Sequence, residues 1–532
     1  MAQNSEKKIY KDDSTLYAPD GNTRPYYHDD LLATRRAGVL MHITSLPGDY
    51  YSGDFGNQAF RFIRFLRDSG HSVWQVLPFT PTSPQTGWSP YSSTSAFAGN
   101  ILFISPEQLA EINLFATKNL KTIKSRASIK SDFSQALMLR LKLTNRAFKH
   151  FSKDQQSEEY LKFKHFCEQE QYWLHDYALF VRLKQHFDNR PWHQWPPKYR
   201  DRQPTALKSF SDDHQEDILL EKFRQYLFSD QWAALKNYAN QLGIYVIGDI
   251  PIYCSYDSAD VWAHPQLFKL NKDKTMSVSA GVPPDYFSKT GQLWNMPVYL
   301  WENHKKEDFE WWLHRIRKNL QWFDHLRLDH FRGFVSGWEV PAMETNAING
   351  QWVDGPGEDF FNRLIALFPH MPFIVEDLGD VDDKVYKLRD QFNLPGMEVL
   401  QFAFGEDMPG SVHIPHNHKS INIVYTGTHD NNTLRGWYNK DIDKPTKKRI
   451  RRYVGRTIKN KKCHQLFTRM AWASPSRLAI IPVQDILGEG SRSRINHPST
   501  KQNNWLWRLQ SMKKLNSIKN ELKKNLETYG RC

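Results

Sequence analysis

Three acidic residues stand at or shortly after the ends of short apolar runs in the 532-residue sequence. They are Asp329 after 325–328, Glu376 after 373–375 and Asp430 after 421–425. A carboxylate is costly to remove from water unless it is paired, so a fold that needs only stability has no use for three of them in such places. Their recurrence predicts a site that handles a cation or a cationic transition state.

The spacing of Arg327 and Asp329 indicates which acid stays ionised. Residues two apart on a strand share a face, so the guanidinium should hold the Asp329 carboxylate ionised and fit to attack an anomeric carbon. A general acid must instead be protonated near neutrality. Glu376 ends an apolar run beside Asp377 and is predicted to have the raised pKa. The alternative is an ordinary buried ion pair with Glu376 beside a helix N-cap.

The elements that must position these acids form a repeating pattern. Apolar runs with β-branched residues end in polar or glycine-rich residues, and most are followed by helical periodicity, as in a parallel (β/α)8 barrel. Seven of the eight expected strands can be named: 38–43, 73–77, 244–247, 325–328, 373–375, 397–402 and 421–425. Barrel enzymes carry their active sites at the carboxyl ends of such strands.

The length fits one α/β barrel with insertions, although size scaling alone would suggest about three domains. We expect a single catalytic body over 1–532. The polar, helix-rich block 106–240 is too long for a simple crossover and is predicted to be an inserted, mostly helical subdomain. The lysine-rich, leucine-spaced segment 505–526 is predicted to be a closing amphipathic helix.

Composition excludes several classes of protein. With 40% hydrophobic and 14% aromatic residues, the chain is not disordered. It has no apolar stretch long enough to span a membrane, and the first eight residues lack the apolar core of a secretory signal, so we expect a soluble, cytoplasmic protein. The four cysteines are too scattered for a zinc site or a disulfide framework.

The net charge of +13 raises the possibility of nucleic-acid binding. The densest basic stretch is 444–462. We interpret it as a solvated helix face, because no nucleic-acid motif accompanies it. No cofactor and no metal are predicted, since the sequence has neither a glycine-rich nucleotide loop nor an acidic loop with calcium spacing. The oligomeric state is left open.

Longer motifs carry a more specific signal. In chain order, together with the three acidic motifs, they are 36–47, 74–78, 89–100, 248–253, 257–262, 281–288, 291–294, 393–402 and 481–488. The sequence thereby resembles the amylomaltase or disproportionating-enzyme family, glycoside hydrolase family 77, within the α-amylase clan. The resemblance runs through most of the chain.

The resemblance implies a retaining 4-α-glucanotransferase that acts on maltooligosaccharides and α-1,4-glucans, with glucose as acceptor or product. It implies Asp329 as nucleophile, Glu376 as general acid and then base, and Asp430 as the acid that stabilises the transition state. The residues that it implies for substrate binding are Tyr91, Asp249, Gln292, Trp294, Arg327 and His429. An α-amylase-like hydrolase, which would use the same three acids, is the alternative.

A few positions depart from the pattern of that family. Asn295-Met296 replaces Gly-Asn, and Asn432 replaces an Asp. Near the C-terminus, Ser499 and Asn503 each replace a Gly. None of these is one of the three acids, but all are expected in sugar-binding loops. Chain-length preference, acceptor choice and the formation of cyclic glucans therefore do not follow from the resemblance.

Overall fold

The computed structural model describes residues 31–111, 128–284, 288–498, 500 and 502–532. The motif 281–288 therefore lies partly outside the described residues, as do Ser499 and the N-terminal segment considered for a signal. Within the described ranges, none of the helices combines the length and apolar character that a membrane-spanning segment needs.

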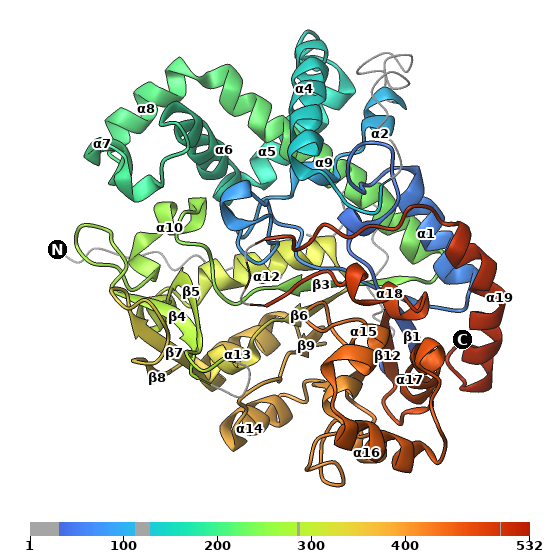
Figure 1. Cartoon of the computed structure of the whole chain (residues 1–532). Coiled ribbons are helices and arrows are strands. Elements are labelled where there is room, and N and C mark those ends of the chain that lie inside the picture. The colour runs from blue at the N-terminus through green and yellow to red at the C-terminus, as the bar shows by residue number, and fades with distance from the viewer. Residues whose placement is uncertain (1–30, 112–127, 285–287, 499, 501) are drawn as a thin grey trace.

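In the described residues, eight parallel strands form the central sheet in the order β10-β11-β12-β1-β2-β3-β6-β9 (Figure 1). The strands are β1 Arg36–Leu40, β2 Val73–Gln75, β3 Tyr245–Ile250, β6 His325–Leu328, β9 Phe373–Val375, β10 Met397–Val399, β11 Ile423–Tyr425 and β12 Leu478–Pro482. The two edge strands of this sheet, β9 and β10, approach each other and close the barrel. Val375 N of β9 donates to Pro395 O, just before β10, at 2.9 Å. The predicted (β/α)8 barrel is confirmed.

The strand that sequence reasoning did not name is β12, which pairs with both β1 and β11. Its five residues are all buried, and a short apolar run of this kind cannot be told from a buried helical segment by periodicity. Four predicted strands extend beyond the observed ones, namely 38–43, 73–77, 397–402 and 421–425. Ile43–Ser45 and Leu400–Phe402 form 3-10 turns, so β1 and β10 end before them.

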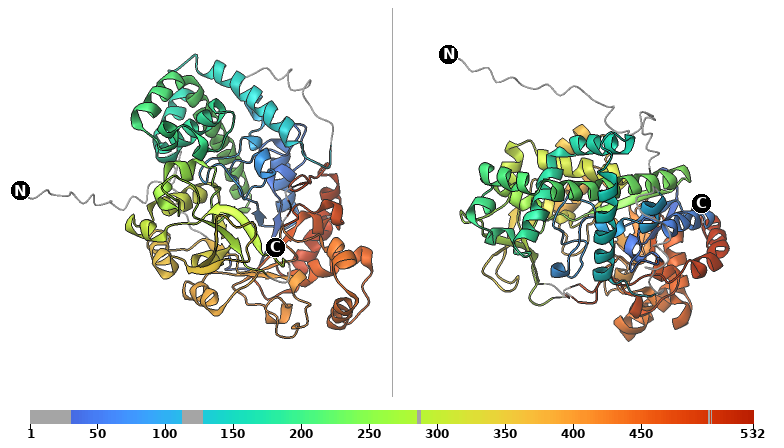
Figure 2. Two further views of the ribbon diagram at one scale, coloured as in Figure 1. Left: turned by 60° about the vertical axis from the view of Figure 1, so that its left-hand side comes forward. Right: turned by 90° about the horizontal axis from the view of Figure 1, so that it is seen from above.

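A block of helices separates β2 from β3. Its members are α2 Pro106–Glu111, α4 Phe133–Phe151, α5 Glu158–Gln169, α6 Gln171–His186, α7 Pro197–Arg200, α8 Pro204–Asp213 and α9 Gln215–Gln241. Figure 1 and the left view of Figure 2 show these teal-to-green helices gathered on one side of the barrel. The division into a barrel and a subdomain at 106 and 240 stays a prediction.

Outside this block the described chain has further helices, one between β1 and β2 and the others after β3. They are α1 Asn57–Asp68, α10 Ala259–Ala263, α11 Trp301–Lys306, α12 Glu310–Trp322, α13 Gly357–Leu367, α14 Asp383–Gln391, α15 Leu434–Gly436, α16 Lys444–Val454, α17 Cys463–Ala473, α18 Val483–Ile486 and α19 Lys513–Thr528. The C-terminal helix thus begins at Lys513, whereas 505–512 is not helical. The basic stretch begins in α16, whose Ile450 is buried.

A second sheet that the sequence did not predict lies beside the barrel. It is antiparallel, in the order β5-β4-β7-β8. Its strands are β4 Val278–Val282, β5 Gln292–Pro297, β7 Ser336–Pro341 and β8 Gln351–Asp354. The chain enters β7 soon after leaving β6, which brings this sheet close to the carboxyl end of β6.

Close packing between the barrel and the helices around it depends on one glycine of β3, since Phe323 also contacts Trp232 of α9. A Cβ added at Gly248 would clash with the ring of Phe323, which is 1% exposed and cannot turn out to solvent. We expect Gly248→Ala to lower the free energy of unfolding by about 1–3 kcal/mol, because overpacking forces the backbone or the ring to shift. Urea unfolding measures this. Gly490→Ala, where an added Cβ meets no atom within 4 Å, is the control and should change stability little. Equal effects of the two changes would contradict this account.

Candidate active site

Arg327 is the centre of a polar cluster at the carboxyl ends of the barrel strands. Its Nη1 donates to both carboxylate oxygens of Asp249, at 2.7 and 2.8 Å, and to Oδ1 of Asp329 at 2.8 Å. Its Nη2 lies 3.7 Å from Oε2 of Glu376. The Arg327 side chain is 3% exposed. One buried cation therefore faces carboxylates from β3, from the end of β6 and from the end of β9.

Strand register explains why these side chains meet. Asp249 on β3 is directly paired with Arg327 on β6. The ladder continues past the strand ends, since Asp329 N donates to Ile250 O and Glu376 N donates to Leu328 O, both at 3.0 Å. Each acid is thus fixed by the backbone of the neighbouring strand.

Burial and charge act in opposite directions in this cluster. Burial alone would lower the pKa of Arg327, but Asp249, Asp329 and Glu376 outweigh it and raise that pKa well above its usual value. Burial raises the pKa of Asp249, and the Arg327 guanidinium opposes the rise. Arg327 therefore remains a permanent positive charge at the centre of the site.

Glu376 has a strongly raised pKa. Its Oε2 accepts a hydrogen bond from the backbone N–H of His330 at 2.6 Å. Removal from water raises its pKa to about 8; Asp329 and Asp430 add to the rise, while Arg327 and the His330 N–H oppose it. Glu376 is therefore protonated at neutral pH, as a general acid must be.

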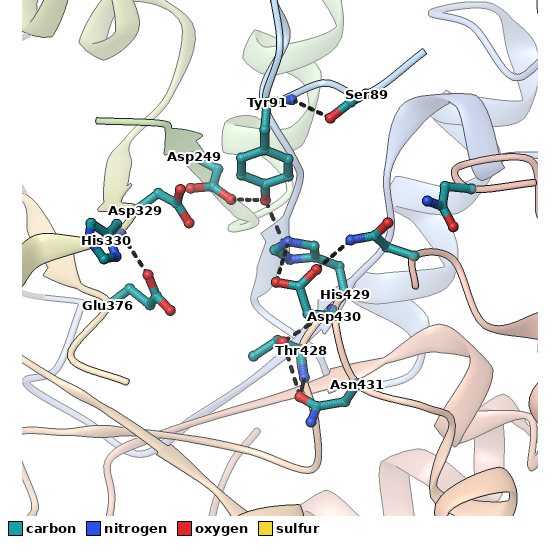
Figure 3. A network of polar contacts seen from close by, with 12 residues as sticks. Ser89, Tyr91, Asp249, Asp329, His330, Glu376, Thr428, His429, Asp430 and Asn431 are labelled. Atoms are coloured by element: carbon teal, nitrogen blue, oxygen red, sulfur yellow. Dashed lines mark hydrogen bonds and ion pairs between the residues drawn. The ribbon is translucent and has the colours of Figure 1, made fainter. Parts of the chain in front are cut away.

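Tyr91 links the Arg327 cluster to the loop after β11. Its hydroxyl donates to Oδ2 of Asp249 at 2.6 Å and lies 3.4 Å from Nδ1 of His429. The Tyr91 and His429 rings are stacked, with centroids 4.9 Å apart and planes 15° apart. Figure 3 shows Tyr91 between Asp249 and His429. The ring of Trp505 lies 5.8 Å from that of Tyr91.

Asp430 is held by the C-terminal part of the chain. Its Oδ1 accepts from Nδ2 of Asn496, and its backbone carbonyl accepts from Nη2 of Arg494, both at 2.6 Å. Its Oδ2 lies 3.3 Å from Nε2 of His429. The Asp430 side chain is 47% exposed. In Figure 3 the carboxyl groups of Asp329 and Glu376 are turned toward the side on which Asp430 lies.

The second sheet contributes Gln292 and Trp294 from β5. The indole N–H of Trp294 donates to Oε1 of Gln292 at 3.3 Å, and its ring meets His330 edge-on at 4.9 Å. Because His330 in turn donates to Glu376, β5 joins the same cluster.

All nine candidate residues are thus connected through direct contacts in one region. The set is Tyr91, Asp249, Gln292, Trp294, Arg327, Asp329, Glu376, His429 and Asp430. Sequence reasoning missed His330, Arg494, Asn496 and Trp505 as members of the region. His330 directly follows a candidate acid, which is a local signal. The other three lie far along the chain and carry none.

Among the described residues, no group of three or more His, Cys, Asp and Glu side chains could hold a metal ion. The carboxylates are gathered around a guanidinium instead. A parallel barrel with such a cluster at the carboxyl ends of its strands is typical of one class of protein. The chain is a barrel enzyme whose site is built from charged side chains on several strand ends.

Comparisons with known proteins give the family. The 4-alpha-glucanotransferase family, glycoside hydrolase family 77, matches residues 41–514, and the chain belongs to this family. A 4-alpha-glucanotransferase of Aquifex aeolicus is 43% identical over 93% of this chain and 99% of its own length. A chloroplastic/amyloplastic one of Solanum tuberosum is 39% identical over 93% and 86%. The amylomaltase of Streptococcus agalactiae, solved with acarbose, superposes with a TM-score of 0.89 at 37% identity, over 93% of this chain and 99% of that one.

Removal of the central cation should be costly. Arg327→Met would leave Asp249, Asp329 and Glu376 without their shared partner, and we expect the free energy of unfolding at pH 7 to fall by about 3–5 kcal/mol. The matched control is Arg363→Met, which breaks the Arg363–Asp308 pair at 2.8 Å with side chains 36% and 68% exposed. That change should cost no more than about 1 kcal/mol. Equal losses in urea unfolding would contradict the central role of Arg327.

Proposed function

We propose that this chain transfers a segment of an α-1,4-glucan to the 4-hydroxyl of an acceptor glucose or glucan by a retaining double displacement. The observation that carries the proposal is the Arg327 cluster. One buried guanidinium donates to Asp329, the nucleophile, while Glu376, the acid and base, is held protonated at the end of the next strand. Membership of the 4-alpha-glucanotransferase family supplies the reaction class.

In the first half-reaction, a carboxylate oxygen of Asp329 attacks the anomeric carbon of the donor. Glu376 gives its proton to the glycosidic oxygen, the C–O bond breaks and the reducing-end fragment leaves. In the second, the acceptor 4-hydroxyl gives its proton to Glu376 and its oxygen attacks the anomeric carbon of the glycosyl-enzyme, so the bond from that carbon to Asp329 breaks and the carboxylate is freed. Two inversions retain the α configuration, and we expect the two carboxyl groups to be about 5–5.5 Å apart.

The remaining candidate residues would bind the sugar at the cleavage point. Arg327 and His429 have donors that can reach sugar hydroxyls, and Asp430 places a negative charge where the oxocarbenium-like transition state develops positive charge. The faces of Tyr91 and Trp294 are suited to stacking on glucose rings. Asp249 holds Tyr91 by the hydrogen bond to its hydroxyl.

The proposed substrates are maltooligosaccharides and α-1,4-glucans, with glucose as acceptor or product. The acarbose bound by the Streptococcus agalactiae amylomaltase, which superposes over nearly the whole chain, supports this assignment. An α-glucan hydrolase would share the three acids and differ in whether water or a sugar attacks the ester. Family membership favours the sugar.

The function can be tested with maltotriose. The protein should release glucose and form maltopentaose and longer species, measured by chromatography, whereas a hydrolase would accumulate only maltose and glucose.

Asp329→Asn, Glu376→Gln and Asp430→Asn should each fold and lose at least about 10³-fold in kcat, because each removes a charge or proton needed in the transition state. Asp390→Asn, which changes an exposed acid of α14, is the control and should keep normal turnover. Near-normal turnover in any of the three variants would contradict its role.

The pKa of Glu376 predicts the pH profile. Glu376 must be protonated to donate, and its pKa is raised to about 8. We therefore expect kcat/KM for maltotriose to be maintained up to about pH 8 and to fall about tenfold per pH unit above that value. The control is a maltosyl fluoride donor, whose fluoride leaves without a proton, so the fall should weaken. A midpoint below pH 6, or an unchanged fall with the fluoride, would contradict this assignment.

A further inference from the structure

One of the sequence motifs, 481–488, supplies none of the nine candidate residues of the site. It contains the end of β12 and the whole of α18. Its acid, Asp485, is 2% exposed. Burial raises the pKa of Asp485 to about 7, because a carboxylate is costly to remove from water. A residue of this kind is stable in the interior only if its hydrogen-bond partners compensate for the burial.

The carboxyl group of Asp485 is bonded to both ends of the segment 426–434, which follows β11 and carries Asp430. Its Oδ2 accepts from Oγ1 of Thr426 at 2.8 Å, and its Oδ1 accepts from the backbone N–H of Leu434 at 2.7 Å. Thr426 and Leu434 are both fully buried. One buried side chain therefore fixes the two ends of this segment relative to each other.

Packing alone does not fix the segment 426–434. A cavity of about 30 Å³ adjoins it, and the lining includes His429 and Asn432 of the segment together with Asp485. A gap next to a side chain removes the contacts that would hold it on that side. Hydrogen bonds must therefore contribute to keeping the segment in place.

The position of the segment matters because Asp430 lies at its midpoint (Figure 3). The Asp430 side chain is 47% exposed, so burial does not fix its orientation. A charged group that faces a transition state must be placed accurately, and a shift of about 1 Å can cost about 10²-fold in rate. Anything that holds the segment therefore acts on the reaction.

We propose that Asp485 is a positioning residue for Asp430 and acts on the reaction through the segment 426–434. The role of Asp430 in the transition state rests on the proposed function, whereas the two hydrogen bonds of Asp485 rest on the structure alone. Arg494 and Asn496 also hold Asp430, so loss of Asp485 should cost less than loss of Asp430 itself.

Asp485→Ala removes both hydrogen bonds and should lower kcat for maltotriose about 10–100-fold. A double-variant cycle shows whether this loss passes through Asp430. In Asp430→Asn the positioned group has already lost its charge, so the addition of Asp485→Ala should lower kcat by less than about threefold more. The same further loss as in the wild-type background would overturn the proposal.

The matched control is Glu398→Ala on β10. Glu398 is also 2% exposed and has a pKa raised to about 7. It likewise accepts from a backbone N–H, that of Lys419 at 2.9 Å, and from a hydroxyl, that of Ser476 at 2.6 Å. Because these partners precede β11 and β12, Glu398→Ala should lower the melting temperature as Asp485→Ala does but keep kcat within about threefold. Equal losses of kcat would contradict the positioning role.

Milder changes keep the test valid if Asp485→Ala does not fold. Thr426→Val removes one of the two bonds at nearly the same volume and should lower kcat about three- to tenfold. Ser476→Ala, which removes the corresponding bond to Glu398, should change kcat by less than about twofold. If both changes lower kcat equally, the proposal is wrong.

Asp485→Asn is the rescue variant. Its amide can accept from the Leu434 N–H and donate to the Thr426 hydroxyl, so kcat should stay within about threefold of the wild-type value. If Asp485→Asn loses as much as Asp485→Ala, the charge acts rather than the hydrogen bonds, and the proposal fails.

Hydrogen exchange separates this proposal from the proposed function. The Leu434 amide should exchange at least about tenfold faster in Asp485→Ala, measured by mass spectrometry of a peptide that contains it, and at an unchanged rate in Glu398→Ala. If wild type does not convert maltotriose but the exchange rises, the proposed function fails and Asp485 still holds the segment. If wild type converts maltotriose and Asp485→Ala keeps normal kcat, the positioning role fails and the proposed transferase stands.

Discussion

The arrangement around Arg327 limits what the rest of the molecule can be. A buried guanidinium that faces three carboxylates is stable only if all of them are held in place, because a charge left unpaired in the interior costs several kcal/mol. The parallel barrel meets this condition by direct strand pairing, which puts Asp249 beside Arg327 and anchors Asp329 and Glu376 by backbone hydrogen bonds to neighbouring strands. The register of the sheet therefore determines which charges meet in the site, and a shift of register would leave Arg327 and its carboxylates unpaired.

The same arrangement places Asp329 and Glu376 in different environments around Arg327. Asp329 and Glu376 both face Arg327, yet the nearest contact is 2.8 Å for the first and 3.7 Å for the second. Because Coulomb attraction falls with distance, the guanidinium attracts the carboxylate of Asp329 more strongly than that of Glu376. Burial raises the pKa of Glu376, so the two carboxyl groups at adjacent strand ends lie in different electrostatic environments.

Much of this arrangement could be predicted from the sequence. Asp329 and Glu376 directly follow apolar strands, so their place at the mouth of the barrel follows from local pattern, and the spacing of Arg327 and Asp329 shows that they share a face. The strand β12 could not be recognised, because a run of five buried residues has no period of its own. The second sheet was missed because its pairing joins segments far apart in the chain. The 3-10 turns after β1 and β10 depend on tertiary contacts that local pattern does not record.

The orientation of Asp430 could not be predicted from the local sequence pattern. In the described part of the chain, no ion pair joins it to Arg327, and the groups that hold it, Arg494 and Asn496, come from the segment before the last helix. It is also the most exposed of the three acids, so burial cannot fix its orientation as it does for Glu376. The third acid must therefore be positioned by hydrogen bonds from distant loops. Since Trp505 of that same segment packs on Tyr91, the C-terminal segment supports the aromatic side of the site as well as its third carboxylate.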